Sequence, residues 1–343
     1  EAPRRIAAML KMLTPWKHPL TRRTLATLSL AALAGAHALT SLAQGWPSKP
    51  VRILLSAAPG ATSDTVSRGV AEVLSKNLNQ PVVVDNRVGA DGMIGMEACA
   101  KAAPDGYTLC GTTSNVIIWN MVLRAKLPYH SLRDFQPVMQ AGFFDSFLVA
   151  NILRPYNTVR EMLDYGKANP DKVNWGHFGV NSTGYMYMSY LKKSRGVSFY
   201  PVPYKTQPQN MLALVAGETD VTITAINTAA PHIRSGKLKP LAVTAAKRVD
   251  WVPNIPTFEE EDIKLPLRSW EGYHFPVGVP REYVERMNTE LRRVYDTPSF
   301  RTNVVERVGL VPNTGTPEAF DQHIRAQLKA VGELVNYLGI KPE

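Results

Sequence analysis

Small and hydroxyl-bearing residues follow an apolar run near residue 55, and together they could hold an anion. The aliphatic residues 51–55 are interrupted by Pro59-Gly60, and Ser63 and Asp64 stand where a helix should begin. A turn between a strand and a helix leaves backbone N–H groups unpaired at the positive end of the helix dipole. Because no Gly-Lys-Ser/Thr triplet closes the turn, it is not a P-loop, and it suits a carboxylate at least as well as a phosphate.

The helix after this turn belongs to a long alternation of strands and helices. One of its faces carries apolar residues at helical spacing, namely Val66, Val70, Val73, Leu74 and Leu78. We expect strands at residues 51–55, 82–85, 107–111, 135–141, 147–151, 173–177, 199–201, 221–225 and 238–243. We expect helices at residues 63–78, 93–102, 159–167, 183–193, 207–216 and 229–235, and further helices near the C-terminus. Short apolar strands that alternate with helices predict an α/β fold whose parallel strands are covered on both faces.

The alternation is interrupted around residues 134–151 and then starts again, which predicts two lobes with a cleft between them. We assign residues 44–147 to the first lobe and 148–268 to the second lobe. The strongly helical residues 269–343 should return to cover the first lobe. The chain beyond residue 43 is long enough to form two such cores.

The first 43 residues are typical of an export signal rather than of a folded domain. Arg22-Arg23 precede an uncharged apolar stretch at residues 25–42, and Ser41-Leu42-Ala43 offers small residues where a signal peptidase would cut. We therefore expect cleavage near Ala43 and a periplasmic mature protein. The arginine pair leaves open whether export follows the Sec or the twin-arginine route. A membrane anchor is the alternative, but the apolar run is short and ends in a site that resembles a cleavage site.

Charge and cysteine content exclude several classes of partner and site. Residues 1–43 hold six cations and one acid, which accounts for half of the formal net charge of +10. The remainder is only mildly basic and has no Lys/Arg run, so we expect no nucleic-acid partner. No His or Cys spacing resembles a metal site, and we expect no metal and no cofactor. Cys99 and Cys110 flank a turn at 104–106 and could form a disulfide, but two buried thiols are the favoured interpretation.

Several short motifs occur in a fixed order along the chain, at residues 58–64, 82–87, 89–95, 102–109, 127–135, 202–205, 231–238 and 241–244. Each is weak alone. In this order and spacing, the chain resembles the periplasmic solute-binding receptors of tripartite tricarboxylate transporters, the Bug family, from about Pro50 to Pro342. The resemblance implies a two-lobed, type II-like periplasmic binding protein. Each lobe would be a mixed, mostly parallel sheet flanked by helices, with the ligand cleft between the lobes.

The resemblance also implies two loops, each leading into a helix N-terminus, that hold a ligand carboxylate partly through bound waters. They correspond to residues 59–64 and 179–184 here. The expected ligand-binding residues are Ala57, Gly60, Ala61, Thr62, Ser63, Asp64, Ser114, Gly179, Asn181, Ser182, Thr183, Tyr204, Thr224 and Trp270. Two alternatives stay open at this point. Ser63 and Asp64 could serve only as a helix cap, and Trp270 could pack the hinge between the lobes.

Three departures from the family pattern bear on the choice of ligand. Ser56-Ala57 replace a common Pro-Phe, which should widen the pocket on one side. Thr224 replaces a frequent acidic residue, so a ligand ammonium group has one partner fewer. The changes at residues 56–57 and at Thr224 both favour an aromatic or longer dicarboxylate over a small amino acid. Ala61 and Thr62 replace common glycines, which would cost about 1 kcal/mol if left-handed backbone were needed there.

The leading hypothesis is an exported receptor, not an enzyme, that captures a small carboxylate and docks on membrane transporter subunits. We expect it to act as a monomer. A second hypothesis is a receptor that presents its ligand to a sensor kinase. A third is an enzyme on the same scaffold, but the candidate nucleophiles Ser63 and Ser182 have no evident His–Asp partners in the sequence. We therefore expect no catalytic residue.

Overall fold

The computed structural model describes residues 45–179, 182–265 and 267–342, and the expected leader at 1–43 lies outside the described residues. The chain divides into two units, Glu1–Ser48 and Lys49–Glu343. The described part of the first unit, residues 45–48, contains no helix or strand. All elements described below belong to the second unit. No helix among the described residues has the length and apolarity needed to cross a membrane.

The first sheet has the strand order β11-β4-β10-β3-β1-β2. Its strands are β1 (Val51–Leu55), β2 (Val82–Asn86), β3 (Thr108–Thr113), β4 (Phe135–Phe144), β10 (Ser269–Pro276) and β11 (Leu310–Pro312). Strand β1 is parallel to β2 and β3, whereas β10 is antiparallel to both β3 and β4. A strand from late in the sequence therefore lies between two early strands.

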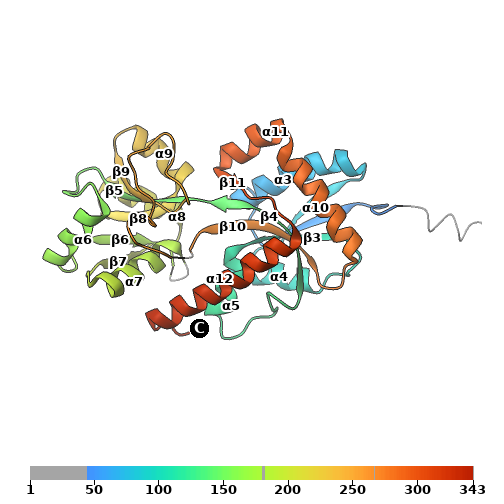
Figure 1. Cartoon of the computed structure of the whole chain (residues 1–343), viewed down its shortest axis with the longest axis horizontal. Coiled ribbons are helices and arrows are strands. Elements are labelled where there is room, and N and C mark those ends of the chain that lie inside the picture. The colour runs from blue at the N-terminus through green and yellow to red at the C-terminus, as the bar shows by residue number, and fades with distance from the viewer. Residues whose placement is uncertain (1–44, 180–181, 266, 343) are drawn as a thin grey trace, which may run out of the picture. The chain divides into compact units, whose positions relative to one another are not determined.

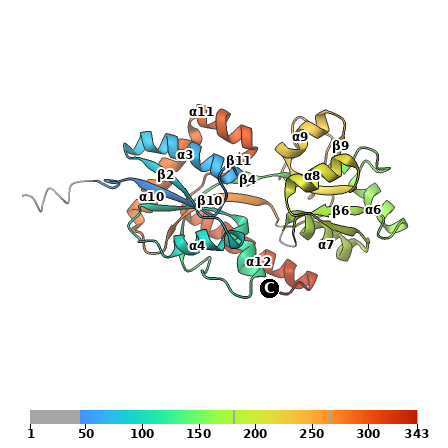
Figure 2. The ribbon, with the colours of Figure 1, turned by 180° about the vertical axis from the view of Figure 1, so that it is seen from behind.

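Helices cover both faces of the first sheet. They are α3 (Thr62–Leu78), α4 (Met93–Ala100), α5 (Asn120–Leu123), α10 (Arg281–Asp296), α11 (Pro298–Phe300) and α12 (Pro317–Leu338), with the short segments η1 (Ala90–Gly92), η2 (Asn115–Trp119) and η3 (Arg301–Glu306). Figures 1 and 2 show α3 and α11 above this sheet and α4 and α12 below it. Gly272 of β10 leaves room for the Phe320 ring of α12, which an added Cβ would meet at 2.4 Å.

The second sheet has the strand order β7-β6-β8-β5-β9. Its strands are β5 (Ser146–Asn151), β6 (Asn174–His177), β7 (Tyr200–Pro203), β8 (Val221–Ala225) and β9 (Leu238–Val243). Strand β6 is parallel to β7 and β8, and β5 is antiparallel to β8 and β9. The accompanying helices are α6 (Val159–Ala168), α7 (Thr183–Arg195), α8 (Gln207–Ala216) and α9 (Ile226–Arg234).

An ion pair joins the two places where the chain passes between the sheets. Asp145 is the single residue between β4 of the first sheet and β5 of the second, and Arg268 directly precedes β10. Arg268 donates to both carboxylate oxygens of Asp145, at 2.6 and 2.8 Å, and its guanidinium stacks 3.9 Å from the centre of the Phe143 ring. Such a bidentate pair fixes orientation as well as distance. The expected lobe boundaries at 147/148 and 268/269 fall close to this pair, and they stay a prediction.

Two expectations about local structure need correction. Helix α3 begins at Thr62, with Ala61 as its N-cap, so Ser63 and Asp64 lie inside the first turn rather than capping it. The favoured interpretation of Cys99 and Cys110 as free thiols is wrong, because the structure joins them in a disulfide with a Cα–Cα distance of 6.1 Å. Helix α4 packs against β3, and this contact brings the two sulfur atoms together in the core.

Candidate functional site

A cavity of about 290 Å³ is lined by residues from both sheets. Its lining consists of Thr62, Ser63, Thr113, Ser114, Asn115, Phe144, Ser146, Phe178, Thr183, Gly184, Gln207, Ile223, Thr224, Ala225, Asn227, Thr228, Ser269, Trp270 and Val308. Many of these residues follow the carboxyl ends of the parallel strands β1, β3, β6 and β8. Loops at that edge of an open α/β sheet are the usual location of ligand sites.

The N-termini of four α-helices contribute to this cavity. Thr62 and Ser63 open α3, Thr183 and Gly184 open α7, Gln207 opens α8, and Asn227 and Thr228 lie in the first turn of α9. The first N–H groups of a helix have no partner within the helix, and the dipole adds partial positive charge there. Helix ends from both lobes therefore favour an anion in this cavity, although the described lining residues include no cationic side chain.

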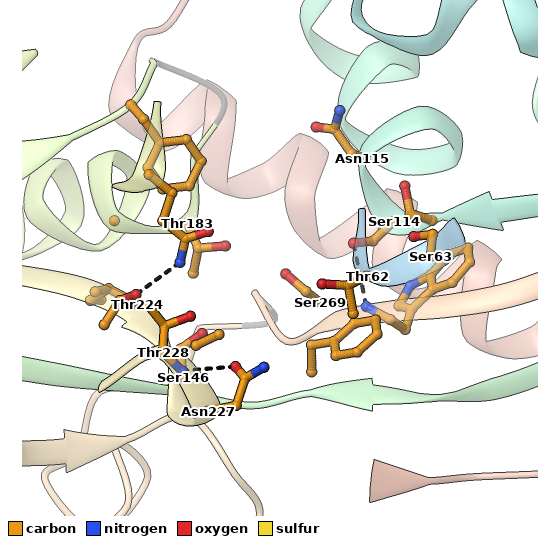
Figure 3. A pocket seen from close by; sticks show the side chains of 18 of the residues that line it. Thr62, Ser63, Ser114, Asn115, Ser146, Thr183, Thr224, Asn227, Thr228 and Ser269 are labelled. Atoms are coloured by element: carbon orange, nitrogen blue, oxygen red, sulfur yellow. Dashed lines mark hydrogen bonds between the residues drawn. The ribbon is translucent and has the colours of Figure 1, made fainter. Parts of the chain in front are cut away.

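Hydroxyl and amide groups supply the polar surface of the cavity. Figure 3 shows Thr62, Ser63 and Ser114 on one side, facing Thr183, Thr224 and Thr228 on the other. None of the described lining residues is an Asp, Glu, Lys, Arg or His. Two lining hydroxyls are held in place, because the Thr224 hydroxyl accepts from the Gln207 amide at 2.8 Å and Ser114 Oγ lies 3.5 Å from the Trp270 amide. The site can offer neutral hydrogen bonds and helix dipoles to an anionic group.

Asp64 shapes the first loop from within. Its carboxylate is buried and accepts the Gly60 N–H at 2.9 Å, the Arg68 Nε–H at 2.8 Å and the Asn86 amide at 2.9 Å. Burial alone would raise the pKa of Asp64, but these hydrogen bonds outweigh it and hold the pKa below its usual value. The same Asn86 amide also donates to the Ala57 carbonyl at 3.0 Å. Asp64 therefore links the loop to the neighbouring strand, next to the cavity-lining Thr62 and Ser63.

Gly60 is the position in this loop where the backbone conformation requires glycine. Its φ is +80°, in the left-handed region, and an added Cβ would meet nothing within 4 Å. The cost of replacing Gly60 is therefore conformational rather than steric. Ala61 has a φ of −66° and Thr62 is helical. The predicted strain at these two positions does not arise, because the left-handed turn occurs one residue earlier.

In the described part of the second loop, Ser182 is the N-cap of α7. Ser182 Oγ donates to the Gly179 carbonyl at 2.7 Å and accepts the Tyr185 N–H at 3.3 Å. Gly179 has a φ of +122°, and its N–H donates to His177 Nδ1 at 3.3 Å. Burial lowers the pKa of His177, so its imidazole is neutral at pH 7. With Ser182 used as the cap, Thr183 is the hydroxyl that this loop presents to the cavity.

Trp270 forms part of the cavity wall and also packs the core. Its side chain is 1% exposed, its Nε1–H donates to Gln327 Oε1 of α12 at 2.5 Å, and its ring meets Phe320 edge-on at 5.1 Å. The two alternatives for this residue are therefore not exclusive. Its indole is fixed by α12 and presents a rigid apolar surface to the cavity.

The cavity brings together some of the expected ligand-binding residues and leaves others outside its lining. Thr62, Ser63, Ser114, Thr183, Thr224 and Trp270 line it. Ala57, Gly60, Ala61, Asp64, Gly179, Ser182 and Tyr204 are not among the lining residues. Asn181 lies outside the described residues. Outside the lining, Asp64 and Ser182 hold their loops with their side chains, whereas Tyr204 donates its backbone N–H to the His177 carbonyl at 2.8 Å. Their contact with a ligand stays a prediction.

Several lining residues were not predicted from the sequence. Asn227 and Thr228 follow β8 in the same way that Thr62 and Ser63 follow β1, and this strand-end position is a signal that could have found them. Gln207 stands at the first position of α8, directly after its Thr206 cap. Val308 comes from a distant C-terminal segment and carries no local signal of a binding role.

Comparison with known proteins points to one family over most of the chain. The family described as tripartite tricarboxylate transporter family receptor matches residues 66–340. BugT of Bordetella pertussis is 27% identical over 324 residues, which cover 93% of this chain and 98% of BugT.

Three solved structures resemble this chain closely in fold. A structure from R. palustris with adipate has a TM-score of 0.74 and 28% identity, and the match covers 87% of this chain and 100% of the other. The periplasmic binding protein BugD has a TM-score of 0.71 and 28% identity, with coverage of 87% and 100%. MatC from Rhodopseudomonas palustris with bound malate has a TM-score of 0.69 and 28% identity, with coverage of 84% and 100%. The expected two-lobed fold of periplasmic binding proteins is confirmed by this likeness.

Proposed function

Because the chain belongs to the tripartite tricarboxylate transporter receptor family, we propose that it captures a small carboxylate in the periplasm and delivers it to a membrane transporter. The first step is reversible binding between the two lobes, with no chemical change in the ligand. The second step is docking of the loaded protein on transporter subunits. Export would depend on cleavage of a leader near Ala43.

One observation carries this proposal, namely the convergence of helix N-termini from both lobes on a cavity whose described lining residues carry no charge. Thr62 and Ser63 of α3 face Thr183 of α7 and Thr228 of α9 across the cavity. A carboxylate placed there would accept N–H and O–H groups from both lobes at once. Binding would then favour the closed arrangement, since only that arrangement lets both sets of donors reach the same anion.

The lining also bears on the class of carboxylate. Adipate and malate, which occupy two of the similar structures, are both dicarboxylates. Thr224 and its neighbours provide no carboxylate among the described lining residues that could pair with a ligand ammonium group. Phe144, Phe178 and Trp270 add apolar surface. We therefore favour a dicarboxylate with an apolar middle over aspartate or glutamate.

A thermal-shift screen followed by calorimetry tests the binding step. Adipate, malate, phthalate, benzoate, aspartate and glutamate would be added to the purified mature protein. We expect the dicarboxylates without an ammonium group to raise the melting temperature most, because binding to the native state stabilises it by mass action. Absence of any shift across the panel, or a clear preference for aspartate or glutamate, would contradict the proposal or its ligand class, respectively.

Paired variants test the location of the site. Thr183→Ala removes a lining hydroxyl at the start of α7, and it should weaken binding of adipate at least tenfold, because a hydrogen bond to a charged group contributes about 1.5–3 kcal/mol. The matched control is Thr289→Ala on α10, where the exposed hydroxyl donates to the Glu285 carbonyl of the same helix. It should bind adipate as tightly as the wild type. Equal effects of the two variants would move the site elsewhere.

Uptake of radiolabelled ligand by cells tests the delivery step. Deletion of the gene should abolish high-affinity uptake of the carboxylate identified by calorimetry, and the wild-type gene should restore it. If uptake persists but transcription induced by the ligand is lost, the protein serves a sensor kinase instead. Incubation with the ligand should leave it chemically unchanged, and turnover would show an enzyme.

A further inference from the structure

A buried carboxyl group lies directly behind the cavity wall. Glu271 of β10 follows Trp270 and stands opposite Thr113 of β3, and both of these neighbours line the cavity. Its side chain is 0% exposed, and neither carboxyl oxygen has a hydrogen-bond partner among the described residues. The Ser63 hydroxyl, another cavity-lining group, is close enough to lower the pKa of Glu271. Ser63 is therefore the link between this carboxyl group and the site.

The surroundings of Glu271 do not compensate a negative charge. On its own strand, Tyr273 points to the same face, and Tyr295 of α10 adds a second buried phenol. Three charged contacts of the neighbouring segments do not involve Glu271: Asp64 pairs with Arg68 on α3, Glu290 pairs with Arg293 on α10, and Arg301 donates to the Tyr295 carbonyl. The adjacent positions on β3 and β4 are Thr113 and Gly142. Among the described residues, no cation forms an ion pair with Glu271.

Burial without a cation favours the neutral acid. This burial raises the pKa of Glu271 to about 8, although the nearby Ser63 hydroxyl acts in the opposite direction. A neutral carboxylic acid has one O–H donor, whereas a carboxylate can only accept. The protonation state of Glu271 therefore decides which way the Ser63 hydroxyl can point.

The two states have opposite effects on an anion in the cavity. When Glu271 is protonated, its O–H can donate to Ser63 Oγ, which leaves the Ser63 proton free to donate into the cavity. When Glu271 is ionised, it accepts that proton, so the Ser63 lone pairs face the ligand. The ionised carboxylate also places a like charge close to the ligand in a poorly solvated region. Both effects weaken anion binding.

We propose that Glu271 is a positioning residue whose bound proton orients the Ser63 hydroxyl toward the anion, so that carboxylate capture is linked to the protonation of Glu271. This inference rests on the proposed function, since it requires an anion in the cavity. It assigns a role to a group that does not touch the ligand. It also makes the affinity for carboxylates depend on pH above neutrality, where the ligand carboxyl groups are already fully ionised.

Calorimetry with adipate and malate between pH 6.5 and 9.5 tests the inference. The wild-type affinity should be constant near pH 7 and fall above pH 8, by up to tenfold per pH unit. Titrations in two buffers with different ionisation enthalpies should show proton uptake on binding in the upper range. Glu271→Gln keeps an N–H donor toward Ser63 but cannot ionise, so its affinity should not vary across this range. The control Glu290→Gln should retain the wild-type profile.

The outcomes separate this inference from the proposed function. If wild-type protein binds at pH 7 but Glu271→Gln keeps the wild-type fall in affinity, the link to Glu271 is wrong while carboxylate capture stands. A wild-type affinity that does not change between pH 6.5 and 9.5 would also show that the link to Glu271 is wrong while carboxylate capture stands. If wild-type protein binds neither adipate nor malate at pH 7, the proposed dicarboxylate site and this inference fail together. Ser63→Ala provides a second check, because removal of the connecting hydroxyl should reduce the fall in affinity above pH 8.

Discussion

Substitution of Glu271 by Gln should change how the stability of the protein depends on pH, even without ligand. Burial raises the pKa of this carboxyl group from 4.5 to about 8 in the folded protein. The unfolded chain therefore loses the proton at lower pH than the folded protein does. The stability associated with the neutral acid is fully present below about pH 4.5 and is lost as the pH rises through about 8.

The size of this effect follows from the shift in pKa. One pKa unit corresponds to about 1.4 kcal/mol, so the wild type should lose about 5 kcal/mol relative to Glu271→Gln between pH 4.5 and 8. Gln has nearly the same volume and cannot ionise. The difference in unfolding free energy between variant and wild type isolates this residue, because the other titrating groups are common to both proteins.

Urea unfolding followed by circular dichroism at intervals from pH 4 to pH 9 gives this difference directly. We expect the unfolding free energy of the variant, relative to that of the wild type, to rise by about 1.4 kcal/mol per pH unit in the middle of the range. The matched control is Glu285→Gln, an exposed glutamate of α10 that pairs with Arg281, and its profile should stay parallel to that of the wild type. A difference for Glu271→Gln that is constant within about 1 kcal/mol would refute the reasoning that this group is buried as a neutral acid.

Three further changes have clear expected outcomes. Asp64→Ala removes a buried acceptor from Gly60 and Arg68, so it should lower the unfolding free energy by about 2 kcal/mol in urea titrations. Because the pKa of Asp64 is lowered in the folded protein, this difference between variant and wild type should shrink as the pH falls below about 4. Replacing Cys99 and Cys110 together by Ala should lower the unfolding free energy by about 3 kcal/mol. A reductant should lower the melting temperature of the wild type but not that of the double variant. Ser182→Ala removes the cap of α7 and should cost about 1 kcal/mol, and an unchanged melting temperature would contradict the capping role.

Strands and helices were largely predictable, because hydrophobic periodicity is a local property of the chain. The run at residues 51–55 and the helical face that includes Val66 and Val70 give β1 and α3 directly. The start of α3 was misjudged by one residue. Ser63 and Asp64 favour a capping position, but here Asp64 reaches back to the Gly60 N–H from within the first turn. A choice between two such hydrogen-bonding patterns depends in part on the distant Asn86, which the local sequence does not place next to Asp64.

Part of the candidate site could also be expected from the sequence. Thr62, Ser63 and Thr183 follow small-residue loops that open helices, and that local pattern predicts exposed N–H groups. The prediction of two free thiols at Cys99 and Cys110 was wrong, because this feature is not determined by the local sequence. Their pairing depends on how α4 packs on β3, and spacing along the chain does not fix that distance.

The sequence by itself determined that this chain builds two α/β lobes and that helix starts rich in small and hydroxyl-bearing residues could bind an anion, because capping, turn chemistry and apolar periodicity act over a few residues. Only the tertiary structure decided which helix starts share one cavity. It also buried Glu271, on a late strand inserted between β3 and β4, next to the cavity-lining Trp270 and Thr113. Burial and the loss of water around a charge are properties of the packed chain, and they turn this glutamate into a buried acid that no local pattern could reveal.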